Sequence, residues 1–151
     1  MEGSSPDAFE AALSALRLKE RTTAELAALL EGRGYRPREV AAAIARLTGA
    51  GELDDGRFAR RYAEDKRELR GWGPERIRAA LEARGVESGL AEVTVDADPH
   101  EAQVGRAREL LQARGRPLGE EADRARALGY LTRRGYDYET AHEAIRRAMR
   151  E

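Results

Sequence analysis

Apolar residues recur along this chain at helical spacing, in short runs separated by glycine and proline. Leu26, Leu29 and Leu30 form one run, and Val40, Ile44 and Leu47 form the next. Spacings of three and four residues place side chains on one face of an α-helix. The pattern therefore predicts three short helices by about residue 50, and the same arrangement twice more along the chain.

Capping residues mark where these helices begin. Thr22 and Glu25 form a capping-box pattern, in which the threonine oxygen accepts an early amide and the glutamate reaches back. Pro37 and Pro74 suit a first helical turn, and Ser5-Pro6 has the same pattern at the start of the first helix. The third helix of each group is expected at 37–48, 88–95 and 138–150, although the β-branched Val93-Thr94-Val95 favours helix poorly.

A repeat becomes visible when three glycines are aligned. Leu30 precedes Gly34-Tyr35 as Leu81 precedes Gly85-Val86 and Leu131 precedes Gly135-Tyr136, at spacings of 51 and 50 residues. A single leucine-x-x-arginine-glycine end is an ordinary C-cap, with glycine in the left-handed conformation. Three at nearly constant spacing indicate duplication.

The expected fold is all-α, an elongated array of three tandem three-helix repeats that resemble helix-turn-helix units. We expect a flexible N-terminus at 1–7 and repeats at 8–53, 54–98 and 99–151. With 41% hydrophobic and only 5% aromatic residues, the chain suits thin cores better than one thick interior.

The amino-acid composition limits the kinds of functional site that we expect in this chain. The chain lacks cysteine and has only two histidines, far apart, so we expect neither a metal site nor a cofactor. No nucleophile arrangement or phosphate-binding glycine loop is recognisable, so we expect no catalytic residues. Without an apolar run long enough for a membrane span or a signal-peptide start, the chain is expected to be a soluble, cytoplasmic monomer. A net charge of −1 confines any anion contact to a local patch.

The middle of the chain resembles a known family. Its residues are Asp54-Asp55-Gly56-Arg57-Phe58-Ala59, Arg67, Gly71-Trp72-Gly73-Pro74-Glu75-Arg76-Ile77, Leu81 and Arg84-Gly85-Val86. This pattern resembles RecX regulatory proteins, and the match extends over about residues 8–150. The resemblance implies binding along the groove of the RecA recombinase filament, with suppression of ATP hydrolysis and strand exchange. It places the protein in recombination, DNA repair and the SOS response. It also implies a long basic surface, whereas the net charge of this chain is only −1.

Local charge points to the middle repeat as the contact surface. Residues 57–84 hold nine Lys and Arg against five Asp and Glu. A step of 100° per residue groups Phe58, Tyr62 and Leu69 and leaves Arg60 and Arg67 opposite, exposed to solvent or to a partner. The candidate partner-binding residues, for the RecA filament and for weak or indirect single-stranded DNA contact, are Arg57, Arg60, Arg67, Arg70, Trp72, Arg76, Arg78, Arg133 and Arg134.

Structural roles compete at several of these positions. The arginines of 57–70 can pair with Glu64 and Glu68, as on any solvated helix face. Trp72 can close a helix junction or anchor a partner, and Arg133 and Arg134 can stabilise a helix C-terminus.

The main alternative function is a helix-turn-helix-like DNA-binding regulator. None of the expected third helices pairs a strongly basic face with the Asn, Gln or Ser near its start that direct base readout favours. A passive helical scaffold is a further alternative, but it would need neither the basic middle repeat nor the family pattern.

Overall fold

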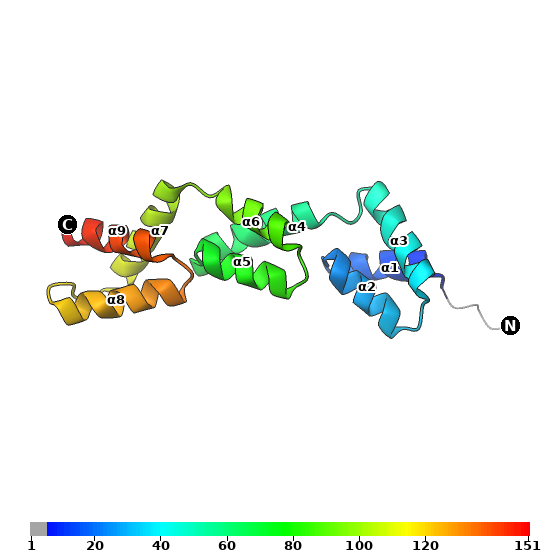
Figure 1. Ribbon diagram of the computed structural model, residues 1–151, viewed down its shortest axis with the longest axis horizontal. Helices are drawn as coiled ribbons and strands as arrows, with labels where there is room; N and C mark the ends of the chain where they lie inside the picture. Colours follow the sequence, from blue (N-terminus) through cyan, green and yellow to red (C-terminus); the bar gives the residue numbers. More distant parts are fainter. Residues whose placement is uncertain (1–5) are drawn as a thin grey trace.

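The computed structural model describes residues 6–151, which form nine α-helices and one π-helical turn without any β-strand (Figure 1). The elements are α1 (Ala8–Leu18), α2 (Thr23–Gly32), α3 (Pro37–Gly49), α4 (Asp55–Asp65), η1 (Lys66–Arg70), α5 (Pro74–Ala83), α6 (Ser88–Asp96), α7 (His100–Arg114), α8 (Glu121–Arg133) and α9 (Tyr138–Met149). They lie in three groups along one long axis, so the predicted all-α array is confirmed. Of the expected flexible segment 1–7, residues 1–5 lie outside the described part.

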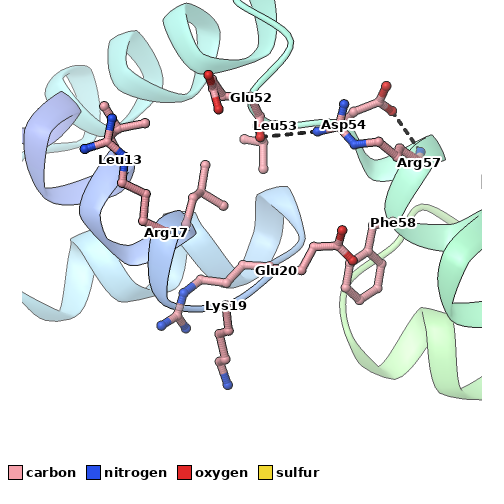
Figure 2. A pocket seen from close by; sticks show the side chains of 11 residues that line it. Leu13, Arg17, Lys19, Glu20, Glu52, Leu53, Asp54, Arg57 and Phe58 are labelled. Atoms are coloured by element: carbon pink, nitrogen blue, oxygen red, sulfur yellow. Dashed lines mark hydrogen bonds between the residues drawn. The ribbon is translucent and has the colours of Figure 1, made fainter.

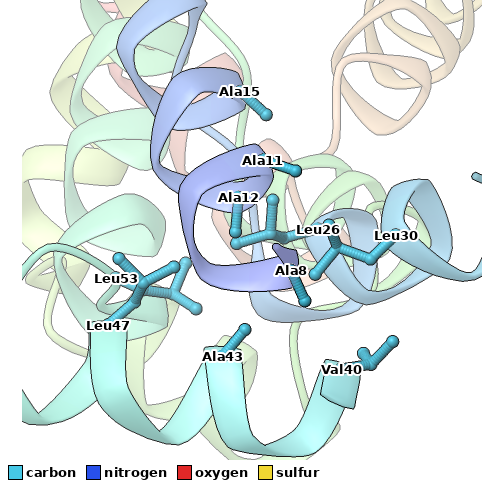
Figure 3. Close-up of a cluster of buried hydrophobic side chains, with 10 residues drawn as sticks. All are labelled: Ala8, Ala11, Ala12, Ala15, Leu26, Leu30, Val40, Ala43, Leu47 and Leu53. Atoms are coloured by element: carbon cyan, nitrogen blue, oxygen red, sulfur yellow. The ribbon is translucent and has the colours of Figure 1, made fainter. Parts of the chain in front are cut away.

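Each group encloses a small core of its own. Leucines of α2 and α3 meet the alanines of α1 in the first group (Figure 3). The first core contains Ala8, Ala11, Ala12, Ala15, Leu26, Leu30, Val40, Ala43, Leu47 and Leu53. The second contains Phe58, Ala59, Ala63, Ile77, Leu81, Val86, Ala91 and Val95. The third contains Val104, Ala107, Leu111, Ala127, Leu131, Tyr136, Ala141, Ala144 and Ile145. Small alanines let the helices approach closely, which is how thin cores with few aromatics are filled.

The aligned positions of the sequence repeat are equivalent in space. Leu30, Leu81 and Leu131 are each fully buried. The glycines that follow them have φ of +92°, +91° and +104°, in the left-handed region that glycine adopts without steric cost. In each repeat the next residue donates its amide to the carbonyl of the aligned leucine, at 3.2, 3.0 and 3.2 Å. The duplication inferred from the glycines therefore extends to backbone geometry.

The second helices of the three groups, α2, α5 and α8, stack end to end in a row (Figure 1). At the start of α5, the Gly73 amide donates to the Arg134 carbonyl at 2.8 Å and the Glu75 amide to the Gly135 carbonyl at 2.9 Å. At the start of α2, the Thr22 hydroxyl donates to the Arg84 carbonyl at 2.7 Å. Each C-terminus thus supplies acceptors to the N-terminus of the neighbouring helix, which satisfies groups that helix ends leave unpaired.

Most predicted helix starts are confirmed. Thr22 accepts the Glu25 amide while the Glu25 carboxylate accepts the Thr22 amide, so the capping box is present. The prediction for Ser5-Pro6 was wrong, because the N-cap of α1 is Asp7, which accepts the Glu10 amide at 2.8 Å. The β-branched segment of α6 is helical, and within it Thr94 donates its hydroxyl to the Leu90 carbonyl at 2.7 Å.

The expected continuous helix over residues 57–70 is interrupted. It is α-helical to Asp65 and then π-helical over Lys66–Arg70, ending at Gly71 with φ +66°. A π-turn advances each residue by less than 100°, so side chains beyond Asp65 rotate away from the extrapolated faces. Leu69, expected beside Phe58, is 78% exposed. Arg67, expected to be exposed, has a side chain only 19% exposed.

We propose that the repeats divide at residues 53/54 and 98/99, as the sequence suggests. Leu53 packs into the first core, and the next residue, Asp54, is the N-cap of α4. Pro99 is the N-cap residue of α7, the first helix of the third group. Across residues 6–151, no helix combines the length and the apolar character that a membrane span requires.

Candidate partner-binding surface at the repeat junctions

The π-turn directs Arg67 toward the second junction, where the middle and third repeats meet. Its Nε lies 3.5 Å from Oδ2 of Asp98, and its guanidinium also donates to the Thr94 carbonyl at 3.5 Å. Asp98 is 5% exposed and pairs with Arg106 of α7 as well. Arg67 therefore joins the middle repeat to the third through a shared buried carboxylate, and the expectation of an exposed contact residue is corrected.

Trp72 packs against the middle core and is also half exposed. Its ring has the Arg76 guanidinium 4.2 Å from the centroid, and the Lys66 ammonium lies 4.9 Å away. Cations over an aromatic face are attracted by the ring quadrupole. The packing role expected for Trp72 is confirmed, because the residue packs against the core that contains Phe58 and Ile77. Its role as an anchor for a partner stays a prediction.

Three candidate arginines meet at the second junction. Arg134 donates to the Arg70 carbonyl at 2.9 Å, and Gly135, its neighbour, lies against Arg76. Within the described residues no carboxylate pairs with any of the three, unlike Arg67 beside them. We call Arg70, Trp72, Arg76 and Arg134 the junction cluster. A groove of about 680 Å³ borders this cluster, lined by Arg70 and Arg134 among others and by the exposed Leu69.

Arg57 lies at the first junction, where the first and middle repeats meet. Arg57 donates to the carbonyls of Gly51 and Glu52 at 3.1 and 3.4 Å, so it holds the end of the first repeat. With Phe58 of the same helix it lines one side of a cleft of about 360 Å³ between the first and second repeats, across from Leu13 and Arg17 of α1 (Figure 2). Arg60 is exposed on α4. These residues are separated from the junction cluster by the length of the middle repeat.

The remaining two candidates, Arg78 and Arg133, differ in their surroundings. Arg78 pairs with Glu75 at 3.4 Å and Glu82 at 3.6 Å, so its charge is largely neutralised on its own helix. Arg133 is exposed in the last turn of α8, where a cation favours the helix dipole.

The sequence did not predict one contact across the first junction. The Arg84 guanidinium of the middle repeat donates twice to the Glu25 carboxylate of the first, at 2.7 and 2.9 Å. This hydrogen bonding lowers the pKa of Glu25 and raises that of Arg84. The only signal in the sequence was the arginine before the repeated glycine, which we read as part of a cap.

We expect Glu25→Gln to flatten the dependence of stability on pH. Because the pKa of Glu25 is lower in the folded chain than its usual 4.5, the carboxylate contributes stability above the unfolded pKa. That contribution is lost as pH falls through the folded value. Urea midpoints measured between about pH 6 and 3 should decline less in the variant than in the parent. Glu31→Gln, an exposed change on the same helix, is the control and should follow the parent curve.

No group of three or more metal-ligating side chains occurs in residues 6–151. The arrangement at the junctions instead offers guanidinium and aromatic groups, which bind carboxylates, phosphates and planar rings without a metal.

Comparison with known proteins assigns the chain to a family. Residues 54–94 match the family described as the second three-helix domain of RecX. The regulatory protein RecX of Thermus thermophilus is 36% identical over 145 residues, covering 96% of this chain and 94% of that protein. That of Stenotrophomonas maltophilia is 36% identical over 141 residues, covering 92% and 83%.

A solved structure has the same fold. The crystal structure of RecX from Lactobacillus salivarius superposes with a TM-score of 0.89 at 19% identity, covering 95% of this chain and 96% of that one. The three-helix domain, the extent of the sequence similarity and the shared fold agree. The chain therefore belongs to the RecX family of regulatory proteins.

Proposed function

We propose that this protein binds the RecA recombinase filament and restrains its ATPase and strand-exchange activities during recombination and DNA repair. Similarity over nearly the whole chain to proteins named regulatory protein RecX carries this proposal. We further propose that it acts in the cytoplasm, as a monomer and without catalysis of its own. An elongated array supports such a role, because its length allows contact with more than one protomer of a filament.

Within the array, we propose that the junction cluster is the main contact surface. Its arginines have no carboxylate partner among the described residues, and Trp72 supplies the kind of aromatic anchor that interfaces favour. Arg57 and Arg60 add a second contact, and Arg133 extends the junction cluster. Arg67 and Arg78 position neighbouring residues and do not contact the partner themselves, since both already pair with carboxylates.

We expect the double reversal Arg70→Glu with Arg76→Glu to raise the concentration needed to inhibit RecA by about tenfold or more, because like charges at an interface cost several kcal/mol. Folding should change little, since Arg70 and Arg76 are exposed. The measurement is the DNA-dependent ATPase of RecA with each protein titrated in. Arg116→Glu with Arg150→Glu makes the same charge change at exposed positions on the third repeat and should inhibit like the parent.

The same titration distinguishes the alternative, a DNA-binding regulator. Binding of each protein to bare single-stranded DNA is measured alongside the ATPase. Inhibition of RecA without tight DNA binding agrees with the proposal of weak or indirect DNA contact. Tight binding to bare DNA with no effect on RecA would replace it with the DNA-binding regulator.

A further inference from the structure

The glycine caps of the three second helices are alike, but among residues 6–151 only two of them are covered by another helix. An ideal Cβ built on Gly85 would lie 2.5 Å from the Cβ of Ala24 in α2. One built on Gly135 would lie 2.5 Å from the Cβ of Arg76 in α5. At Gly34 no described atom lies within 4 Å of that position. The cap that ends α2 therefore has the structure of the two covered caps, but no helix of the described residues docks on it.

The two covered caps share one kind of occupant, the first turn of a helix. The N-cap residues that approach them are small, Thr22 at one junction and Gly73 at the other. Gly73 is small by necessity, since a Cβ there would lie 2.6 Å from the Gly135 carbonyl carbon. The approaching amides and hydroxyl donate to the carbonyls of the cap, at the negative end of the helix dipole.

The charges around Gly34 indicate which kind of side chain the first turn of a docked helix would have. Arg33 is the counterpart of Arg84, which forms its bidentate pair with Glu25, the third residue of its helix. Arg33 is exposed and pairs with no carboxylate of the described residues. Arg36 and Arg38, also exposed, follow within one turn. A carboxylate in the first turn of a docked helix would therefore pair with Arg33 as Glu25 pairs with Arg84.

We infer that the Gly34 cap is a docking site for the N-terminal turn of an α-helix from another protein, with a small N-cap residue and a carboxylate in that turn. This inference extends the interface that the chain itself uses twice. It is independent of the RecA proposal, because it concerns the chemistry of the site and not the identity of the protein that supplies the helix.

A second copy of this chain is a poor occupant. The second-helix N-terminus that its described part leaves unstacked is that of α8, which begins one turn further from its glycine than α2 and α5 do. Its N-cap is Glu120 and its first residue is Glu121. Its third residue, Asp123, supplies a first-turn carboxylate, but Glu120 places a long side chain at the N-cap position, where the two docked helices have Thr22 and Gly73.

The test uses a helical peptide with the sequence of residues 20–33, the segment whose start occupies the Gly85 cap. A lactam bridge in its second half keeps it helical, because short isolated helices are marginal in water. We expect millimolar peptide to shift the NMR amide signals of Arg33, Gly34 and Tyr35 in the full-length protein. A peptide carrying Glu25→Arg should shift them at least about fivefold less, as the loss of one ion pair in a short contact implies.

Two variants of the protein complete the test. Gly34→Asn keeps the left-handed backbone, which asparagine tolerates, but places a side chain where the helix would dock. Gly51→Asn is the matched control, since Gly51 has φ +77° and also has nothing within 4 Å. Peptide shifts should disappear in the first variant and persist in the second.

Shifts that are absent from residues 33–35, or that survive Gly34→Asn, would overturn the inference. Concentration-dependent self-association of the parent protein that Gly34→Asn abolishes would also overturn it, because the occupant would then be a second copy.

Discussion

Replacing Asp98 with alanine is expected to lower the free energy of unfolding by about 3 kcal/mol, at the low end of the values for breaking a buried ion pair. Asp98 is 5% exposed and is the shared partner of Arg67 and Arg106. Its removal leaves two partly buried guanidinium groups without a carboxylate, and both the π-turn and α7 lose their common contact. Urea unfolding followed by circular dichroism measures the change.

Asp96→Ala is the matched control for that change. Asp96 is two residues away, exposed, at the end of α6. A carboxylate at a helix C-terminus opposes the dipole, so its loss should leave stability unchanged or slightly raised. If both variants unfold at the same urea concentration, the paired arginines contribute nothing to the second junction.

Gly135→Ala is expected to lower stability by about 2–5 kcal/mol, through left-handed strain together with overpacking. The new Cβ would lie 2.5 Å from the Cβ of Arg76 and 2.7 Å from its backbone nitrogen. Backbone cannot move aside as a flexible side chain can, so the third repeat must shift away from α5. Small-angle scattering should show a changed overall shape in addition to the lower urea midpoint.

Gly34→Ala separates the two contributions. It imposes the same strain, at φ +92°, where nothing lies within 4 Å. We expect a loss of only about 1–2 kcal/mol, the cost of the left-handed conformation itself. Equal losses in the two variants would mean that the close approach at Gly135 has no energetic weight.

Periodicity predicted most of this fold because helices depend on local spacing. The capping box at Thr22 and the glycine caps at Gly34, Gly85 and Gly135 follow from residues within one turn of each other. The π-turn could not be predicted in this way. Arg67, within this turn, pairs with Asp98, a residue 31 positions later in the chain, and a fixed step of 100° per residue carries no information about such a distant contact.

The candidate contact surface stays a prediction, and one structural detail of it was wrong, since Arg67 was expected to be exposed and is largely buried. The sequence indicated the basic middle repeat and Trp72, but not the distinction between arginines that already have a partner and those that do not. Arg67 and Arg78 pair with carboxylates, whereas Arg70 and Arg76 do not among the described residues. The bidentate pair of Arg84 with Glu25 joins residues 59 apart, so only the folded chain reveals it.

The end-to-end row of α2, α5 and α8 fixes the distances between sites on different repeats. The three helices contain 10, 10 and 13 residues, which at 1.5 Å per residue corresponds to a rod of about 50 Å. Its length is set by helical rise and by the close contacts at Gly85 and Gly135, while the loops between repeats lie outside it. Sites at different points along the rod are therefore held at fixed separations. A partner whose binding sites recur at regular intervals can contact several of them at once only if its interval equals those separations.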